Sequence, residues 1–148
     1  MVQRLERGRI DRAGRVSRES GTVQRGASFR QAQRLKGRRA FSRVFGGRRS
    51  SADRLLVVYA MPNDLSWARL GLTVGRKHGM AVRRNRIKRL LREAFRLGLG
   101  ELPRGYDFVC VPRVGSLGTL SEYRQALRAL ANRAAGLWQS RRDRTKDA

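Results

Sequence analysis

The segment from Ala81 to Arg96 restricts the fold more than any other part of the chain, because it must be a packed helix and a cationic surface at once. Its apolar residues recur at the i, i+3, i+4, i+7 and i+8 spacing of one helical face. They are Ile87, Leu90, Leu91, Ala94 and Phe95. The opposite side collects polar residues, namely Asn85, Lys88, Arg89, Arg92 and Arg96. The pattern predicts a helix that packs one face on a core and leaves a basic face in solvent.

This basic face carries too few acidic residues to neutralise it. Arg84, Lys88 and Arg92 stand four residues apart, and each such like-charged pair destabilises a helix by about 0.2–0.5 kcal/mol. Glu93 is the only acidic residue in the segment. Over the whole chain, 35 Lys and Arg stand against 11 Asp and Glu, which gives a formal net charge of +24 and a pI near 12.0. A run of charge is ordinarily a solvated face, but this excess indicates a partner that supplies phosphates.

Length and composition predict one domain with one core. The chain has 148 residues, of which 40% are hydrophobic. Its single cysteine, Cys110, lies in an apolar run, which predicts a buried thiol and excludes an intrachain disulfide. The apolar stretch from Leu55 to Met61 is too short to span a bilayer, and the N-terminus lacks the apolar core of a signal peptide. We therefore expect a cytoplasmic protein without a membrane partner.

The sequence offers no residue set for independent catalysis. His78 is the only histidine, and it stands in a glycine-flanked loop without a nucleophile beside it. Four-ligand zinc spacing is absent, and the carboxylates are scattered singly along the chain. We therefore expect no catalytic residue, no metal site and no cofactor held by the protein alone.

Hydrophobic patterning predicts a small α+β domain with helices on one face of a sheet. The expected elements before the basic helix are a helix over 37–45, a short extra strand over 50–53, and strands over 55–61 and 69–74 that pair as a hairpin. A strand over 107–111 and a final helix follow the basic helix. The final helix has Thr119 or Ser121 as N-cap. Its apolar stripe is Tyr123, Leu127, Leu130, Ala134 and Leu137.

The two ends of the chain differ from its middle in composition. Residues 1–33 repeat Arg among Gly, Ser, Glu and Gln, which is typical of a basic disordered arm. A transit peptide is also rich in Arg and Ser, but Glu6, Asp11 and Glu19 argue against it. Residues 140–148 form a polar tail of mixed charge. We expect the folded domain over 34–139.

The chain resembles the protein component of bacterial ribonuclease P. The resemblance covers about 34–137 and is carried by Arg34-Leu35-Lys36, by Ala40 to Phe45, by Leu70 to Lys77, and above all by Ala81 to Arg89. In the last of these, Arg-Asn-Arg is followed by Lys and Arg on a predicted helix, which makes the motif specific. The resemblance implies a two-layer α/β sandwich with a small mixed sheet in α-β-β-(β)-α-β-α order, of the kind found in the second domain of ribosomal protein S5. It also implies a left-handed crossover around the basic helix, although right-handed crossovers are the general rule.

The resemblance implies a function in transfer RNA processing. The family's protein is a small basic subunit that binds the catalytic RNA and the 5′ leader of precursor tRNA, and it aids endonucleolytic removal of the leader to give the mature 5′ end. Hydrolysis of the phosphodiester would be carried by the RNA subunit, with Mg²⁺ held through the RNA and the substrate. The implied partners are this RNA and precursor tRNA, and the sequence leaves the oligomeric state of the holoenzyme open.

Two other functions suit the size and charge of the chain. One is a non-catalytic ribosomal or other structured-RNA-binding protein, from which only the motif separates this sequence. The other is a membrane-active or nucleoid-coating cationic protein, for which charge alone suffices. In the second of these, Arg84→Ala with Arg89→Ala would weaken binding only in proportion to the charge removed, whereas a loss concentrated on one RNA partner would exclude it.

Matching the family's motif assigns site residues of two kinds. RNA contacts fall to Arg76, Lys77, Arg84, Asn85, Arg86, Lys88, Arg89 and Arg92. Leader binding falls to Phe41, Phe45 and Tyr59, because an aromatic ring stacks on a base of any identity, at on the order of 1–3 kcal/mol per base. Considered without the resemblance, Phe41 and Phe45 are more typical of core residues, since they stand at i and i+4 on an apolar helix face.

Overall fold

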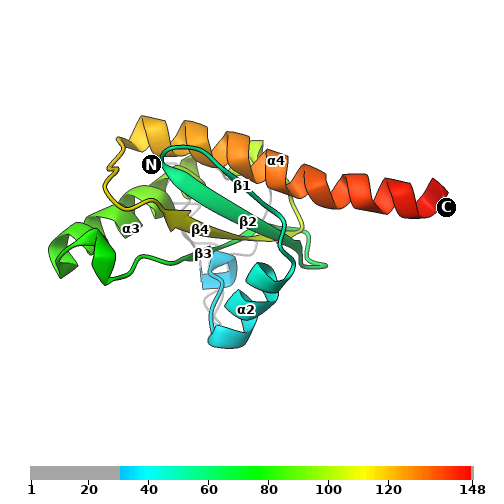
Figure 1. Ribbon diagram of the computed structural model, residues 1–148, viewed down its shortest axis with the longest axis horizontal. Helices are drawn as coiled ribbons and strands as arrows, with labels where there is room; N and C mark the ends of the chain where they lie inside the picture. Colours follow the sequence, from blue (N-terminus) through cyan, green and yellow to red (C-terminus); the bar gives the residue numbers. More distant parts are fainter. Residues whose placement is uncertain (1–30, 148) are drawn as a thin grey trace, which may run out of the picture.

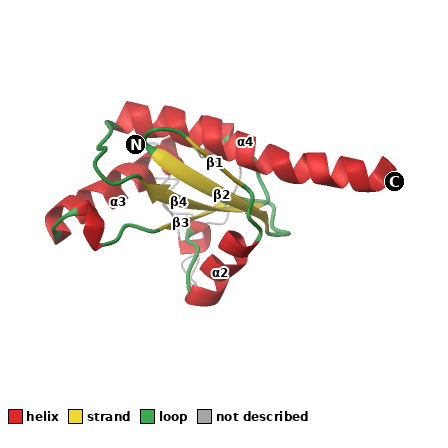
Figure 2. Cartoon of the chain, in the orientation of Figure 1, coloured by secondary structure: helices red, strands yellow, loops and turns green. Residues whose placement is uncertain are grey.

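The computed structural model describes residues 31–147, with side chains described as far as Ser140. The predicted arm over 1–33 lies outside the described residues except for its last three, which form the 3-10 turn η2 (Gln31–Gln33). The other elements before the basic helix are α2 (Arg38–Gly46), β1 (Ser50–Ala52), β2 (Leu56–Pro62), β3 (Arg69–Leu72) and η3 (Arg76–His78). The basic helix is α3 (Ala81–Leu97), followed by η4 (Leu99–Glu101), β4 (Tyr106–Pro112) and α4 (Leu120–Asp147) (Figures 1 and 2). The type and place of each expected helix and strand are thus confirmed.

The four strands form one mixed sheet in the order β1-β2-β4-β3. Strand β4 pairs antiparallel with β2 and parallel with β3. The predicted hairpin between the second and third strands is therefore wrong, because β4 lies between them. All of β4 is buried except the half-buried Val111, so this strand takes the centre of the sheet, while the four-residue β3 lies at an edge. The connection from β3 through α3 to β4 is a parallel crossover, whose left hand stays a prediction from the resemblance.

Helices cover both faces of the sheet. Helices α3 and α4 pack together on one face, and α2 lies against β2 and β4 on the other (Figure 1). The prediction that all helices share one face is wrong because the central strands are apolar in both alternating sets of residues. In β2, Val58 and Ala60 belong to the core under α3 and α4, whereas Tyr59 and Met61 pack with α2. Both sets need cover from water.

The two long helices follow their predicted patterns with one exception. In α3, Ile87, Leu91, Ala94 and Phe95 are buried and Leu90 packs against them, as expected. In α4, the predicted stripe is buried except Leu137, which is 42% exposed. Trp138 packs there instead, and its Nε1 donates a hydrogen bond to the carbonyl oxygen of Ala60 at 2.8 Å. Beyond that contact α4 extends past the sheet, so the predicted polar tail is helical through Asp147 (Figure 2).

The N-terminus of α4 has the capping residue that the sequence predicts. The Glu122 amide donates to Thr119 Oγ1 at 3.1 Å, and the Thr119 amide donates to Glu122 Oε1 at 2.9 Å. This reciprocal pair is a capping box, which satisfies two backbone donors at the helix start. Thr119, rather than Ser121, is therefore the cap.

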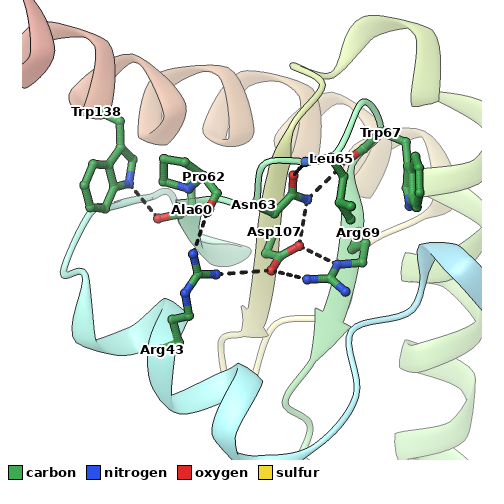
Figure 3. A network of polar contacts seen from close by, with 9 residues as sticks. All are labelled: Arg43, Ala60, Pro62, Asn63, Leu65, Trp67, Arg69, Asp107 and Trp138. Carbon is green, nitrogen blue, oxygen red and sulfur yellow. Dashed lines mark hydrogen bonds and ion pairs between the residues drawn. The ribbon is translucent and has the colours of Figure 1, made fainter.

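A buried carboxylate fixes the edge strand beside the central one. Asp107 on β4 is 1% exposed, and Arg69 on β3 donates to it from Nε at 2.7 Å and from Nη2 at 2.8 Å (Figure 3). Hydrogen bonding to Asp107 raises the pKa of Arg69. Asn63 donates to Asp107 at 2.9 Å and to the carbonyl oxygen of Trp67 at 3.2 Å, while Arg43 of α2 lies 3.8 Å away. The network ties β3 and the residue that follows β2 to β4, and it compensates the buried charge.

Candidate nucleic-acid interface

The outer face of α3 presents cations without acidic partners. Asn85, Arg86 and Arg89 are exposed, and Lys88 and Arg92 are half-buried. Within the described part of the chain, none of these four cations forms an ion pair, because Glu93 is engaged by Arg96 one turn further on. The hydrogen bond to Arg96 lowers the pKa of Glu93, so this carboxylate stays charged and committed to that arginine. The first three turns of α3 therefore form an unneutralised surface.

Side chains that bind backbone carbonyl groups hold the start of α3 in place. The half-buried Arg84 donates from Nε to the carbonyl oxygen of Gly79 at 3.1 Å. Arg76 and Lys77 are exposed on η3, just before the helix. His78 ends η3 and is buried, with Nε2 at 2.8 Å from the carbonyl oxygen of Pro112. Because a carbonyl only accepts, Nε2 carries the proton, and the bond fixes the cationic turn to the end of β4.

A cleft of about 200 Å³ lies between α2, β3 and α3. Its walls are Arg34, Leu35, Lys36, Phe41, Leu70, Gly71, Leu72, Lys88 and Arg92. Cations therefore line part of it, and an aromatic ring lines another part. Burial lowers the pKa of Arg92, and the nearby charge of Arg34 lowers it further, so a bound anion would stabilise both guanidinium groups.

Glycine at position 71 makes room for the aromatic wall of the cleft. A Cβ atom there would lie 2.7 Å from Cζ of Phe41 and 3.1 Å from Cδ2 of Leu35. The bare backbone of β3 thus lets the Phe41 ring lie directly against the strand. The half-buried ring keeps part of its surface for solvent or a ligand.

The three predicted leader-binding aromatics lie in one cluster but in different surroundings. All three pack around Leu35, Val44 and Val109 on the α2 face of the sheet. Phe45 and Tyr59 meet edge to face, with ring centroids 4.8 Å apart at 81°. Of the three, Phe41 alone lines the cleft. The structure thus brings Phe41 together with Lys88 and Arg92 of α3, and pairs Phe45 with Tyr59 beside them.

Sequence reasoning missed part of the cleft. The family's motif gives no role to Arg34 and Lys36, although Arg34-Leu35-Lys36 belongs to the resemblance. Leu35 is buried and its amide donates to the carbonyl oxygen of Leu70 at 2.9 Å, so the segment runs beside β3. The alternation of charge and apolar residue was the available signal, because alternate residues of an extended segment point to opposite sides.

The described residues form neither a metal site nor a membrane-spanning helix. In this part of the chain no three or more His, Cys, Asp or Glu side chains are grouped so as to hold a metal ion. None of the described helices has the length and apolar character needed to cross a membrane. Cys110 is buried, as predicted, and burial raises its pKa to about 12, which leaves the thiol protonated.

Comparison with known proteins identifies the family. The family model described as Ribonuclease P matches residues 29–135, which is well over half of the chain. The chain belongs to the ribonuclease P protein family. This family membership agrees with the motif on α3. It does not favour the alternative of a ribosomal or other structured-RNA-binding protein. As a ribonuclease P protein component, it is part of an endoribonuclease holoenzyme.

Relatives in this family come from several bacteria. The ribonuclease P protein component of Thermotoga maritima is 43% identical over 86 residues, which are 58% of this chain and 74% of the relative. That of Clostridioides difficile is 38% identical over 89 residues, 60% of this chain and 78% of the relative. The solved RNase P protein from Thermotoga maritima superposes with a TM-score of 0.59 at 36% identity, covering 64% of this chain and 90% of that one. The solved Staphylococcus aureus RNase P protein superposes with a TM-score of 0.60 at 31% identity, covering 68% of this chain and 93% of that one.

Proposed function

We propose that this ribonuclease P protein binds the catalytic RNA subunit through α3 and the 5′ leader of precursor tRNA through the cleft beside Phe41. The observation that carries the proposal is the continuity of the two surfaces. Lys88 and Arg92 belong both to the cationic face of α3 and to the cleft wall opposite α2. A polyanion on α3 and a single strand in the cleft would therefore lie side by side, as the RNA subunit and its substrate must at the cleavage point.

The cations would act by neutralising phosphates and releasing counterions. Each phosphate contact contributes about 0.7 to 0.9 to the slope of log affinity against log salt concentration, depending on whether the RNA is single-stranded or double-helical. Arg76 and Lys77 on η3 extend the cationic surface before α3. Guanidinium groups suit this task because their forked donors match phosphate oxygens.

The cleft would hold the leader without reading its sequence. Stacking of a base on the half-buried ring of Phe41 is tolerant of base identity, because every base has a flat face. Arg34, Lys36 and Arg92 would accompany the leader phosphates along the cleft wall. This division suits a subunit that must accept precursors with different leaders.

The chemistry itself would belong to the RNA subunit. Phosphodiester hydrolysis requires activation of water, which Mg²⁺ held by RNA and substrate would supply. In this proposal, the protein holds no catalytic residue and no cofactor of its own. It lowers the repulsion between leader and RNA phosphates, and so strengthens binding of substrate and metal. We place the assembly in the cytoplasm.

Leader release at low magnesium tests this function. Purified protein is mixed with a bacterial ribonuclease P RNA and a precursor tRNA that carries a 5′ leader, and release is compared with RNA alone and protein alone. We expect strong stimulation of the RNA, no release by the protein alone, and a lower magnesium requirement with the protein present. Absence of stimulation by the folded protein with its cognate RNA would overturn the proposal. An unchanged magnesium requirement would contradict the screening mechanism.

A further inference from the structure

The most exposed large apolar side chains in the described residues stand at the start of the cationic helix. Val82 is 81% exposed and Met80 is 80% exposed. At about 100° per residue, Val82 lies about 180° from the buried Leu91, and within about 60° of Asn85, Arg86 and Arg89 on the helix circumference. Val82 is therefore an exposed apolar residue among Asn85, Arg86 and Arg89, three of the residues that we assign to RNA binding.

The folding of the chain gives no reason for apolar residues at these positions. Met80 is the N-cap of α3 and makes no side-chain hydrogen bond there, whereas Ser or Asp would stabilise the helix start. Val82 is β-branched and favours a helix less than Ala does. The first turn has no acidic residue, and Arg83 and Arg84 carry charge of the wrong sign for the positive end of a helix dipole. This turn is built for contact with an anion rather than for a free helix.

We propose that Val82 packs against the face of an unpaired nucleobase in the RNA subunit. The inference rests on the proposed function, and it adds the kind of RNA structure that α3 recognises. A base that has left its stack offers a flat apolar face, and the phosphates on either side of it carry the charge that complements Arg86 and Arg89. The bases of a continuous double helix are stacked and offer no such face, so a regular duplex would leave Val82 in water.

A conservative substitution separates this contact from electrostatic binding. Val82→Ala removes two methyl groups, keeps every charge, and favours the helix, so the variant retains its fold. We expect its dissociation constant for a ribonuclease P RNA transcript to rise roughly tenfold. The slope of log affinity against log salt concentration should stay that of the unchanged protein, because no phosphate contact is lost. Val114→Ala is the matched control, since Val114 is 55% exposed in the loop after β4, and its affinity should not change.

Chemical probing of the RNA locates the contact. Ribose acylation should show a nucleotide that the unchanged protein protects and that becomes reactive in the Val82→Ala complex, while other protections persist. Equal affinity of the two valine variants, or an identical protection pattern, would overturn the inference and leave the proposed function intact. Failure of the unchanged protein to bind the transcript or stimulate it would overturn the proposed function itself. A changed salt slope in Val82→Ala would assign the loss to rearranged charges and also overturn the inference.

Discussion

At the scale of single residues, the two phenylalanines of α2 should behave differently. Phe41 lines the cleft, whereas Phe45 packs edge to face on Tyr59. We expect Phe41→Leu to weaken holoenzyme binding of precursor tRNA by about 1–3 kcal/mol, because a leader base loses its stacking partner. Phe45→Leu should leave that affinity nearly unchanged and lower the free energy of unfolding instead. Dissociation constants and urea denaturation of both variants measure the two effects.

The matched ligand for this comparison is a mature tRNA without a leader. Its affinity should be the same for Phe41→Leu and the unchanged protein, since no base then occupies the cleft. An equal loss for precursor and mature tRNA would contradict stacking on the leader. At this scale the sequence predicts part of the cleft only. Phe41 can be predicted as a stacking residue from its aromatic type. The need for glycine at position 71 cannot be predicted, because it depends on a ring that approaches from another element.

At the scale of elements, α3 should separate stability from binding by its two faces. Leu91 is fully buried, so Leu91→Ala should lower the free energy of unfolding by about 2–5 kcal/mol. Lys88→Ala removes the charge repulsion between Lys88 and its neighbours Arg84 and Arg92. The free energy of unfolding should therefore stay constant or rise by up to about 1 kcal/mol. The same variant should bind the RNA subunit more weakly. Urea denaturation followed by circular dichroism gives the free energy of unfolding, and an RNA affinity measurement gives the binding. A loss of stability in Lys88→Ala equal to that in Leu91→Ala would contradict this separation.

Elements were predictable where their signal is local. The i, i+3, i+4 pattern of α3 and the Thr119 cap of α4 are contained in short segments, and both are confirmed. Pairing of β2 with β3 was predicted from their adjacency in sequence and was wrong, because β4 has greater burial on both faces and takes the centre. The ion pair of Arg69 with Asp107, 38 residues apart, fixes that order and has no local signature. The RNA and leader contacts themselves remain predictions from the family's motif.

At the scale of the whole molecule, the net charge of +24 should make the stability of the free protein depend on salt concentration. Self-repulsion destabilises a compact chain of one sign, and the screening length falls from about 10 Å at 0.1 M to about 3 Å at 1 M salt. We expect the thermal midpoint of the isolated protein to rise with KCl concentration, with equal effects of NaCl because screening depends on ionic strength. A midpoint that is constant or falls would show that the surface charge is already compensated within the chain.

The RNA subunit should relieve the same repulsion by a different route, and the two routes oppose each other. Bound RNA stabilises the folded state in proportion to the logarithm of its concentration over its dissociation constant. Salt weakens that binding through counterion competition, so the stabilisation by RNA should shrink as the stabilisation by salt grows. Melting curves with and without the RNA subunit should therefore converge with increasing salt. Curves that stay equally far apart would mean that apolar contacts and stacking, rather than the unneutralised face of α3, dominate the complex.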